Sequence, residues 1–394
     1  MDYIKLNELC EINIGKTPSR NKNEYWGKGF NWLSISDLKE SRISETKEEI
    51  TDIAIKECNM RIVPRNTVVM SFKLSIGKTA ILDKDMYTNE AIANFPIKNK
   101  EVIFPEYLFY ALSTVNFNNT DRAVMGATLN KSKLNEIKIP YCNLENQKKI
   151  VNVLDKSQEL INKRKEQIEA LDELVKSKFI EMFGDPALNP MNWQVVELGS
   201  LLRQKASNGF FAKNNEYKID GNTKVMWLGD IINRRYSNTK GLKSVDATEV
   251  QLNKYRVKYG DLLFCRSSLN KDGIGKASAV PKNVDNNIMF ECHVIRAPLD
   301  LSKCIPEFIQ VQSTLDYFRN QIMSNSKTAT MTTIGQDGII ATKVILPDIK
   351  LQKQFVEIIY QIDKLKFELE KSLKELEDNF NSLMQRAFKG ELFQ

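Results

Sequence analysis

Two short segments contain Ile-Gly-Lys and resemble the end of a phosphate-binding loop. Residues 75–82 read SIGKTAIL, and residues 273–280 read GIGKASAV. A phosphate-binding loop needs G-x-x-x-x-G-K-[ST], because the first glycine starts the turn whose backbone N–H groups surround the phosphates. Phe72 and Asn270 stand where that glycine is required, and Ala277, after the second lysine, has no hydroxyl for magnesium. The spacing therefore argues against a nucleotide-hydrolysing enzyme.

The cysteine and histidine residues that could form a zinc site are few and dispersed. The chain has six cysteines, no two of them at C-x-x-C spacing, and one histidine, His293. Zinc sites need clusters of such ligands. We therefore expect no metal site and no cofactor. The strand-like surroundings of His293, FECHVIR, indicate a structural residue.

The composition is compatible with a nucleic-acid partner. The formal net charge is +7, which permits a polyanionic partner, although a slightly basic globular protein would look the same on charge alone. Unpaired cysteines are typical of a reducing compartment. No apolar run approaches the ~18–20 residues of a membrane helix, and the first residues, MDYIKLNELCEI, lack the pattern of a secretory signal. We expect a cytoplasmic protein.

The Ile-Gly-Lys segment occurs twice because the chain is duplicated. Seven landmarks recur in the same order, with an offset that grows from 192 to 207 residues. Such a period is too long for a solenoid and indicates a repeated domain-sized module. The matching pairs are Leu6 and Leu9 with Leu198 and Leu201, Trp32-Leu33 with Trp227-Leu228, the segments from Val63 and Val257, Ile76-Gly77-Lys78 with Ile274-Gly275-Lys276, the segments from Pro105 and Pro306, Ile139-Pro140 with Leu346-Pro347, and Gln147 with Gln354.

Each module is predicted to be a mixed α/β (α+β) domain followed by a long helix. Residues 1–140 and 186–347 alternate short β-type runs with turn residues. Residues 141–185 and 348–394 contain long stretches without glycine or proline, in which apolar residues recur at 3–4 spacing. The apolar residues are Ile150, Leu154, Ile161, Ile168, Leu171, Val175 and Met182 in the first helix, and Ile362, Leu365, Leu369, Leu373, Leu376, Phe380 and Leu383 in the second.

These narrow stripes favour helices that pack on each other. A stripe of the a/d type suits a helix partner better than the broad face of a domain. We expect an antiparallel coiled coil with pseudo-two-fold symmetry between the two modules. The alternative is two separate amphipathic helices, each lying on its own domain.

Three segments resemble a known family, the specificity (S) subunits of type I restriction–modification systems. They read IPYCNLENQKKIVNVLDK at 139–156, MFGDPALNPMNWQVVELGSLL at 182–202 and ILPDIKLQKQFVEIIYQIDK at 345–364. The resemblance covers the whole chain. It implies two target-recognition domains, at 1–140 and 186–347, and coiled-coil helices at 141–185 and 348–394.

The resemblance also implies the function. An S subunit has no catalytic residues of its own. It recognises a bipartite, asymmetric sequence in double-stranded DNA, commonly for adenine methylation. It docks two methyltransferase (M) subunits and the restriction/translocase (R) subunits, which carry out the catalysis.

Two other functions remain open on the residues alone. NPMNW at 189–193 faintly echoes the Asn-Pro-Pro-aromatic motif of amino-methyltransferases, but Met191 replaces the second proline and no glycine-rich loop precedes it. A self-sufficient methyltransferase is therefore disfavoured, and we interpret this segment as a turn. A coiled-coil adaptor that binds only proteins is the other alternative.

Candidate DNA contacts are polar residues clustered on predicted loops. Base edges are read by Arg, Lys, Asn, Gln, Ser and Thr, and phosphates are contacted mostly by Lys and Arg. For any single residue, a solvated surface position is the commoner outcome. The first domain offers Lys16, Thr17, Ser19, Arg20, Asn21, Lys22, Lys73, Ser75, Lys78, Thr128, Asn130 and Lys131. The second offers Lys205, Asn208, Lys213, Asn214, Arg234, Arg235, Tyr236, Arg266, Ser267, Ser268, Asn270, Lys271, Lys276, Lys327, Thr328 and Thr330.

Overall fold

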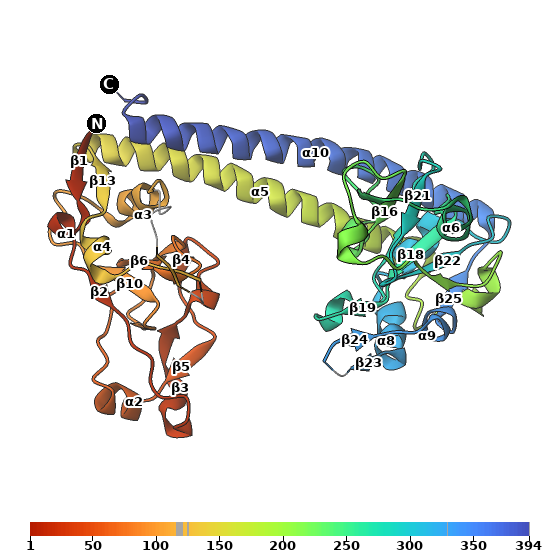
Figure 1. Cartoon of the computed structure of the whole chain (residues 1–394), viewed down its shortest axis with the longest axis horizontal. Helices are drawn as coiled ribbons and strands as arrows, with labels where there is room; N and C mark the ends of the chain where they lie inside the picture. Colours follow the sequence, from red (N-terminus) through yellow and green to blue (C-terminus); the bar gives the residue numbers. More distant parts are fainter. Residues whose placement is uncertain (116–120, 124–125, 329, 394) are drawn as a thin grey trace. The chain divides into compact units, whose positions relative to one another are not determined.

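The computed structural model describes residues 1–115, 121–123, 126–328 and 330–393, and the side chains of 121–123 and 126–128 lie outside the described part (Figure 1). The chain divides into two compact units. Unit 1 consists of Met1–Lys165 and Lys371–Gln394, and unit 2 consists of Glu166–Glu370. Each unit therefore contains one globular domain and a part of each of two long helices.

A five-stranded sheet forms the centre of unit 1. Its middle strand, β6 (Val68–Ser71), is buried along its whole length, as its continuous apolar run predicts. Helix α3 (Pro105–Ser113), which starts with a proline in its first turn, contacts this sheet at β6 and β8. The strand order is β2 (Asn13–Ile14), β10 (Ile92–Phe95), β6, β8 (Thr79–Leu82) and β4 (Arg42–Ile43).

Three smaller sheets complete the described part of unit 1. In the first, β3 (Trp26–Leu33) lies between β5 (Glu48–Ile50) and β9 (Tyr87–Thr88), and α2 (Asp52–Glu57) packs beside it. In the second, β12 (Gly126–Thr128) lies between β11 (Asp121–Ala123) and β7 (Lys73–Leu74). In the third, β1 (Asp2–Lys5) pairs with β13 (Lys138–Tyr141). The short helices α1 (Leu6–Leu9) and α4 (Lys131–Asn135) contact each other next to this last pair.

Unit 2 repeats this arrangement. Its largest sheet has the order β15 (Ser207–Asn208), β22 (Val294–Pro298), β18 (Asp261–Cys265) and β20 (Ala277–Ala279), and Tyr236 forms a parallel bridge to Ala279 in the place of β4. β16 (Thr223–Met226) lies between β17 (Lys243–Val245) and β21 (Ile288–Phe290), with the parallel pair placed as in unit 1. The remaining elements are β14 (Gln194–Glu197) paired with β25 (Lys343–Leu346), the sheet β19 (Ser267–Ser268), β24 (Thr332–Thr333) and β23 (Lys327–Thr328), and the helices α6 (Glu249–Tyr255), α7 (Pro306–Gln312), α8 (Asp316–Asn325) and α9 (Gln336–Ile340).

The structure corrects two of the predicted landmark pairs. Lys138 pairs with Lys5 and Lys343 pairs with Glu197, so β13 and β25 correspond at an offset of 205 residues, not 207. At that offset the partner of Gln147 is Gln352. Both glutamine side chains are fully buried and donate to a backbone carbonyl five residues earlier in the chain. Ile139-Pro140 and Leu346-Pro347 are similar in sequence but do not occupy equivalent positions in the two units. Equivalent positions are defined by strand register and not by residue identity.

Each long helix begins and ends with the same local signals. In α5 (Leu144–Phe183) the side chain of Asn143 accepts a hydrogen bond from the N–H of Asn146, and in α10 (Ile349–Lys389) Asp348 accepts one from Lys350. Both helices stop at a glycine with positive φ, Gly184 at 74° and Gly390 at 81°. Capping residues therefore fix both helix lengths from the sequence.

In each unit, parts of the two helices pack on each other and on the domain. In unit 1, Lys165 lies 3.1 Å from Glu377, and the ring of Phe388 lies 5.4 Å from that of Tyr107 on α3. In unit 2, Phe179 and Phe183 each place their rings 5.5 Å from Phe355 on α10, and Phe183 also contacts the α7 residue Phe308 at 5.1 Å. The end of α10 therefore closes the core of unit 1 as the end of α5 closes the core of unit 2.

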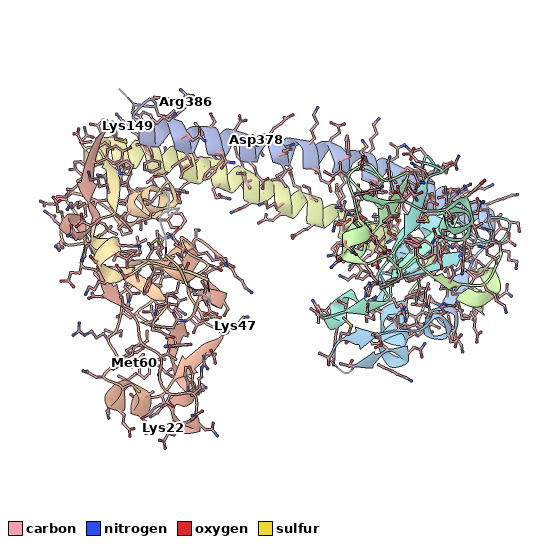
Figure 2. All side chains as sticks on the ribbon, in the orientation of Figure 1. Lys22, Lys47, Met60, Lys149, Asp378 and Arg386 are labelled. Atoms are coloured by element: carbon pink, nitrogen blue, oxygen red, sulfur yellow. The ribbon has the colours of Figure 1, made fainter. Side chains whose placement is uncertain are left out.

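The predicted fold is confirmed, with changes to the apolar stripes. Ile150, Leu154, Ile161 and Val175 are buried as predicted, and polar side chains such as Lys149 and Arg386 cover exposed helix positions (Figure 2). Leu365 was assigned to the stripe incorrectly, since it is 51% exposed. The main buried aromatic residues of the helices, including Phe179, Phe183 and Phe355, were missed because they face the domain, so the helix needs a wider apolar face than a two-helix seam.

Candidate nucleic-acid interface

The Ile-Gly-Lys segment forms the same glycine turn in both units. Gly77 has φ 89° and donates its N–H to the carbonyl of Ser71 at 2.9 Å, while Gly275 has φ 63° and donates to Cys265 at 2.8 Å. The last residue of the preceding strand, Ser71 of β6 or Cys265 of β18, donates its backbone N–H to the carbonyl of the lysine. The distances are 2.9 Å to Lys78 and 2.9 Å to Lys276. These backbone bonds make the turn a rigid connection between two strands.

In unit 1 this turn lies beside a small sheet that carries several predicted contacts. β7 holds Lys73 and pairs with β12, where Lys73 lies opposite Thr128. Lys78 and Ser75 are exposed on the turn. The side chain of Asn130 accepts a hydrogen bond from the N–H of Lys133 at 2.8 Å and so caps α4. Lys131 is exposed in the first turn of α4, and the side chain of Thr128 lies outside the described residues.

Unit 2 places an equivalent small sheet beside the second turn. Ser267 and Ser268 on β19 lie opposite Thr333 and Thr332 on β24, and β23 brings Lys327 and Thr328 next to them. Lys271, Lys327, Thr328 and Thr330 are exposed, whereas Ser267 is 6% exposed. Asn270 accepts a hydrogen bond from the Asp272 N–H at 3.0 Å, and Arg266 donates to the carbonyl of Cys292 at 3.2 Å. The fold therefore brings together candidates that are about 60 residues apart in the sequence.

The first loop of unit 1 holds its cations in internal contacts. The Arg20 guanidinium lies 3.8 Å above the ring of Trp26 and donates to Glu48 at 2.5 and 2.8 Å, and this pairing lowers the pKa of Glu48. Lys22, labelled in Figure 2, donates to the Tyr25 hydroxyl at 2.7 Å and to Glu57 at 2.9 Å.

Other candidates on the first loop are less constrained. Lys16 is exposed and donates to the carbonyl of Cys58 at 2.6 Å. Ser19 and Asn21 are exposed, and Thr17 is partly buried with an unpartnered hydroxyl. Two indole rings of β3 hold this loop, because Trp26 donates to the carbonyl of Ser19 at 3.1 Å and Trp32 donates to that of Lys16 at 3.0 Å.

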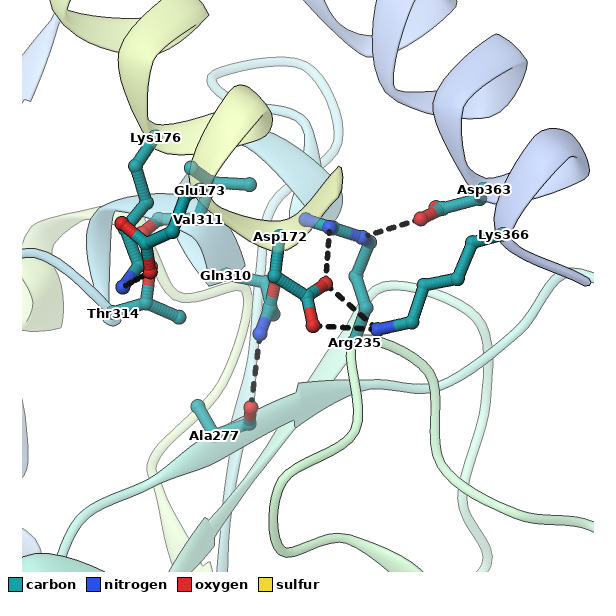
Figure 3. A network of polar contacts seen from close by, with 10 residues as sticks. All are labelled: Asp172, Glu173, Lys176, Arg235, Ala277, Gln310, Val311, Thr314, Asp363 and Lys366. Carbon is teal, nitrogen blue, oxygen red and sulfur yellow. Dashed lines mark hydrogen bonds and ion pairs between the residues drawn. The ribbon is translucent and has the colours of Figure 1, made fainter. Parts of the chain in front are cut away.

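Arg235 and Tyr236 face the long helices in unit 2. Arg235 is 14% exposed and donates to Asp363 of α10 at 2.9 Å, with Asp172 of α5 at 3.9 Å (Figure 3). Asp172 also accepts two bonds from Lys366, at 2.6 and 2.7 Å. Tyr236 stacks on the ring of Tyr360 at 6.5 Å, and burial raises the pKa of its hydroxyl. These two side chains hold the domain on the helices, a role that their sequence context did not indicate.

Next to these contacts lies a cavity of about 590 Å³ within unit 2. Its walls include Arg234, which is exposed, and Lys276, which donates to Asn233 at 2.6 Å. The remaining predicted contacts of this unit lie elsewhere. Lys205, Lys213 and Asn214 are exposed, and Asn208 is partly buried on β15.

His293 contacts the acid Glu291 and, at 3.6 Å from Nδ1, the thiol of the neighbouring Cys292. Its Nδ1 lies 2.8 Å from Oε2 of Glu291, which also accepts the backbone N–H of His293. Glu291, Cys292 and His293 form the one group in the described residues whose ligand atoms lie close enough for a metal, within 4.8 Å of one another. Adjacent positions in a single turn account for this proximity. Helices long and apolar enough to cross a membrane are also absent from the described residues.

Comparisons with known proteins agree with this architecture. The model of the family described as type I restriction modification DNA specificity domain matches residues 1–170 and 190–378. The type I restriction enzyme MjaIX specificity subunit of Methanocaldococcus jannaschii is 32% identical over 58% of this chain and 56% of that protein. The EcoKI specificity subunit of Escherichia coli is 23% identical over 90% of this chain and 82% of that protein.

A solved structure shares the fold. One chain from a structural study of complex assembly and conformational transition of the type I restriction–modification system is 16% identical, with a TM-score of 0.56, covering 99% of this chain and 98% of that one. The predicted resemblance is confirmed, and neither a self-sufficient methyltransferase nor a protein-only adaptor is favoured. Because the family model matches both halves, the chain belongs to the family of type I restriction–modification DNA specificity domains.

Proposed function

We propose that this chain selects the DNA target of a type I restriction–modification complex. It recognises a bipartite, asymmetric sequence in double-stranded DNA. It docks two methyltransferase subunits and the restriction subunits, and these partners carry out methylation and cleavage. The two recognition domains are residues 1–140 and 186–347, the docking helices are 141–185 and 348–394, and the complex works in the cytoplasm, where the DNA lies.

The main support is a repeated fold with divergent loops. Both units present the same glycine turn beside a three-stranded sheet, although the residues on these elements differ. The connection from Ser71 to Gly77 is shorter than its counterpart from Cys265 to Gly275. A conserved scaffold with different loop chemistry suits two domains that read two different half-sites, because base edges are distinguished by the donors and acceptors placed against them.

The proposed DNA contacts are candidates around these turns, of which Lys73, Arg266 and Ser268 are partly buried. In unit 1 they are Lys73, Ser75, Lys78 and Lys131, together with Thr128. In unit 2 they are Arg266, Ser268, Lys271, Lys327, Thr328 and Thr330. Arg235 and Tyr236 are left out because they contact the helices, and the other candidates remain predictions.

The decisive experiment is methylation mapping with and without this chain. The chain would be co-expressed with its methyltransferase partner, and methylated adenines would be located across a bacterial genome. We expect one interrupted, asymmetric motif that disappears without this chain. A complex that assembles but methylates without sequence preference would contradict the proposal. Co-purification with the methyltransferase tests docking separately.

A further inference from the structure

Leu74 combines two features that do not stabilise the fold. In the described residues, six non-glycine residues have positive φ, and five of them are asparagines, the type that tolerates this region best. The sixth is Leu74, with φ 63° and a side chain that is 64% exposed. A bulky residue in the left-handed region is strained, and such strain gathers at functional sites.

The backbone around Leu74 is held firmly enough to maintain this conformation. Leu74 ends β7, where it lies opposite Ala127. Just before it, the fully buried Ser71 donates its hydroxyl to the carbonyl of Ser75 and accepts the N–H of Lys78 at 3.1 Å. Together with the bond from the Gly77 N–H to the Ser71 carbonyl, these bonds join the residues before Leu74 to the residues after it. The leucine is therefore held outward by a rigid hairpin.

The matching loop of unit 2 also exposes a leucine, one residue after Ser268, which strand register makes the counterpart of Leu74. Leu269 directly follows β19 and is 83% exposed. The Asn270 carbonyl accepts the N–H of Gly273 at 3.0 Å, and its side chain accepts the N–H of Asp272. A scattered exposed leucine needs no explanation, but two leucines before the same turn of a duplicated fold do.

The surroundings of both leucines indicate a polyanionic partner. Lys73 and Lys78 flank Leu74, and Arg266 and Lys271 flank Leu269. Cations beside a single rigid apolar side chain suit DNA, in which phosphates surround apolar base surfaces. Apolar side chains contact the thymine methyl group in the major groove or insert at an unstacked base step.

We propose that Leu74 and Leu269 are specificity-determining residues that each contact the apolar surface of a base in one half-site. This inference rests on the proposed function. The apolar surface is either the 5-methyl edge of a thymine or the face of an unstacked base. In either case the leucine discriminates among sequences, while the adjacent basic side chains hold the phosphates.

The test uses Leu74→Asn in the complex with the methyltransferase. Asparagine suits a positive φ, so the variant should keep the melting temperature of the wild type or exceed it. Affinity for the mapped target should fall about tenfold, while affinity for an unrelated duplex stays within about twofold. Leu74→Met, which keeps an apolar side chain, should restore most of the discrimination. Leu269→Asn should act in the same way on the other half-site.

A matched control is Ile62→Asn, at a 52% exposed position of the same domain. This variant should leave target affinity unchanged. If Leu74→Asn lowers the melting temperature, Leu74→Gly replaces it, because glycine also accepts the turn. A folded variant that discriminates the target as well as the wild type overturns the inference. A wild-type complex without any discrimination overturns the proposed function instead.

Two DNA modifications separate the two base surfaces. Replacing thymine by deoxyuridine in one half-site removes the 5-methyl groups. If Leu74 contacts the methyl edge, this replacement should weaken DNA binding by the wild type but not by the Leu74→Asn variant. A 2-aminopurine probe should brighten on binding of the wild type alone if a base is unstacked. A response in neither arm, together with unchanged discrimination by Leu74→Asn, rules out both contacts.

Discussion

Three cysteines lie in the cores of the domains. Cys10 is 1% exposed, and Cys265 and Cys304 are fully buried. Burial raises the pKa of the Cys10 and Cys304 thiols to about 12 and that of Cys265 to about 11. The thiols therefore remain protonated and behave as small apolar side chains, as the scattered sequence positions suggested.

These thiols predict instability at alkaline pH. The folded state keeps the protons that the unfolded chain releases from pH 9.0 upward, so stability falls as the pH rises from about 9 to about 12. Each buried thiol should lower the free energy of unfolding by up to about 1.4 kcal/mol per pH unit in this window. Urea unfolding at pH 8, 9.5 and 10.5 measures the slope. Cys304→Ala should reduce it, and an identical slope in this variant would contradict the assignment.

At the scale of elements, a loop of unit 2 is fastened to both long helices. Arg235 follows β16 in the chain and contacts Asp363 of α10 and Asp172 of α5. Burial raises the pKa of Asp363, and one of its oxygens has no partner. The charges of Arg235 and Asp363 compensate each other where water is largely excluded. Removing one of the two charges therefore leaves the other buried without a partner.

A double-mutant cycle measures this connection. Arg235→Met and Asp363→Asn should each cost about 2–3 kcal/mol of unfolding free energy, because each leaves a buried group unpaired. The double change Arg235→Met with Asp363→Leu should cost less than the sum of the single changes.

The control for this cycle is a more exposed pair between the same helices. Lys165 and Glu377 are 51% and 45% exposed, so Lys165→Gln should change stability by less than about 0.5 kcal/mol. Additive effects at Arg235 and Asp363 would show that the two side chains are not coupled. Chemical denaturation of the full chain supplies these values.

At the scale of the whole molecule, the net charge of +7 predicts that DNA binding weakens as salt rises. With two recognition domains, each domain should contribute its own part of this salt dependence. Lys78 and Lys271 are exposed beside the two glycine turns. If each contacts a phosphate, Lys78→Gln and Lys271→Gln should each reduce the slope of log K against log salt by about one.

Footprinting of the complex assigns each effect to a half-site. Lys78→Gln should weaken protection of one half of the target and Lys271→Gln that of the other. Lys149→Gln is the matched control, because Lys149 pairs with Glu145 on an exposed helix face. Loss of protection over both halves in one variant would show that the domains do not bind independently.

The sequence by itself determined the duplication, the mixed α/β domains and the two long helices. Caps, turn residues and apolar spacing are local signals, and Asn143, Asp348, Gly184 and Gly390 act within a few residues of their own positions. The absence of a phosphate-binding loop was also evident from the sequence, because that loop requires a glycine at a fixed spacing before Gly-Lys.

Only the tertiary structure decided which side chains meet. Strand register matched Gln147 with Gln352, and packing turned Arg235 toward the helices and held Leu74 outward with a positive φ. Each of these outcomes depends on contacts between segments far apart in the chain. Residue type and spacing do not encode such contacts, since the direction of a side chain follows from the register and packing of the elements around it.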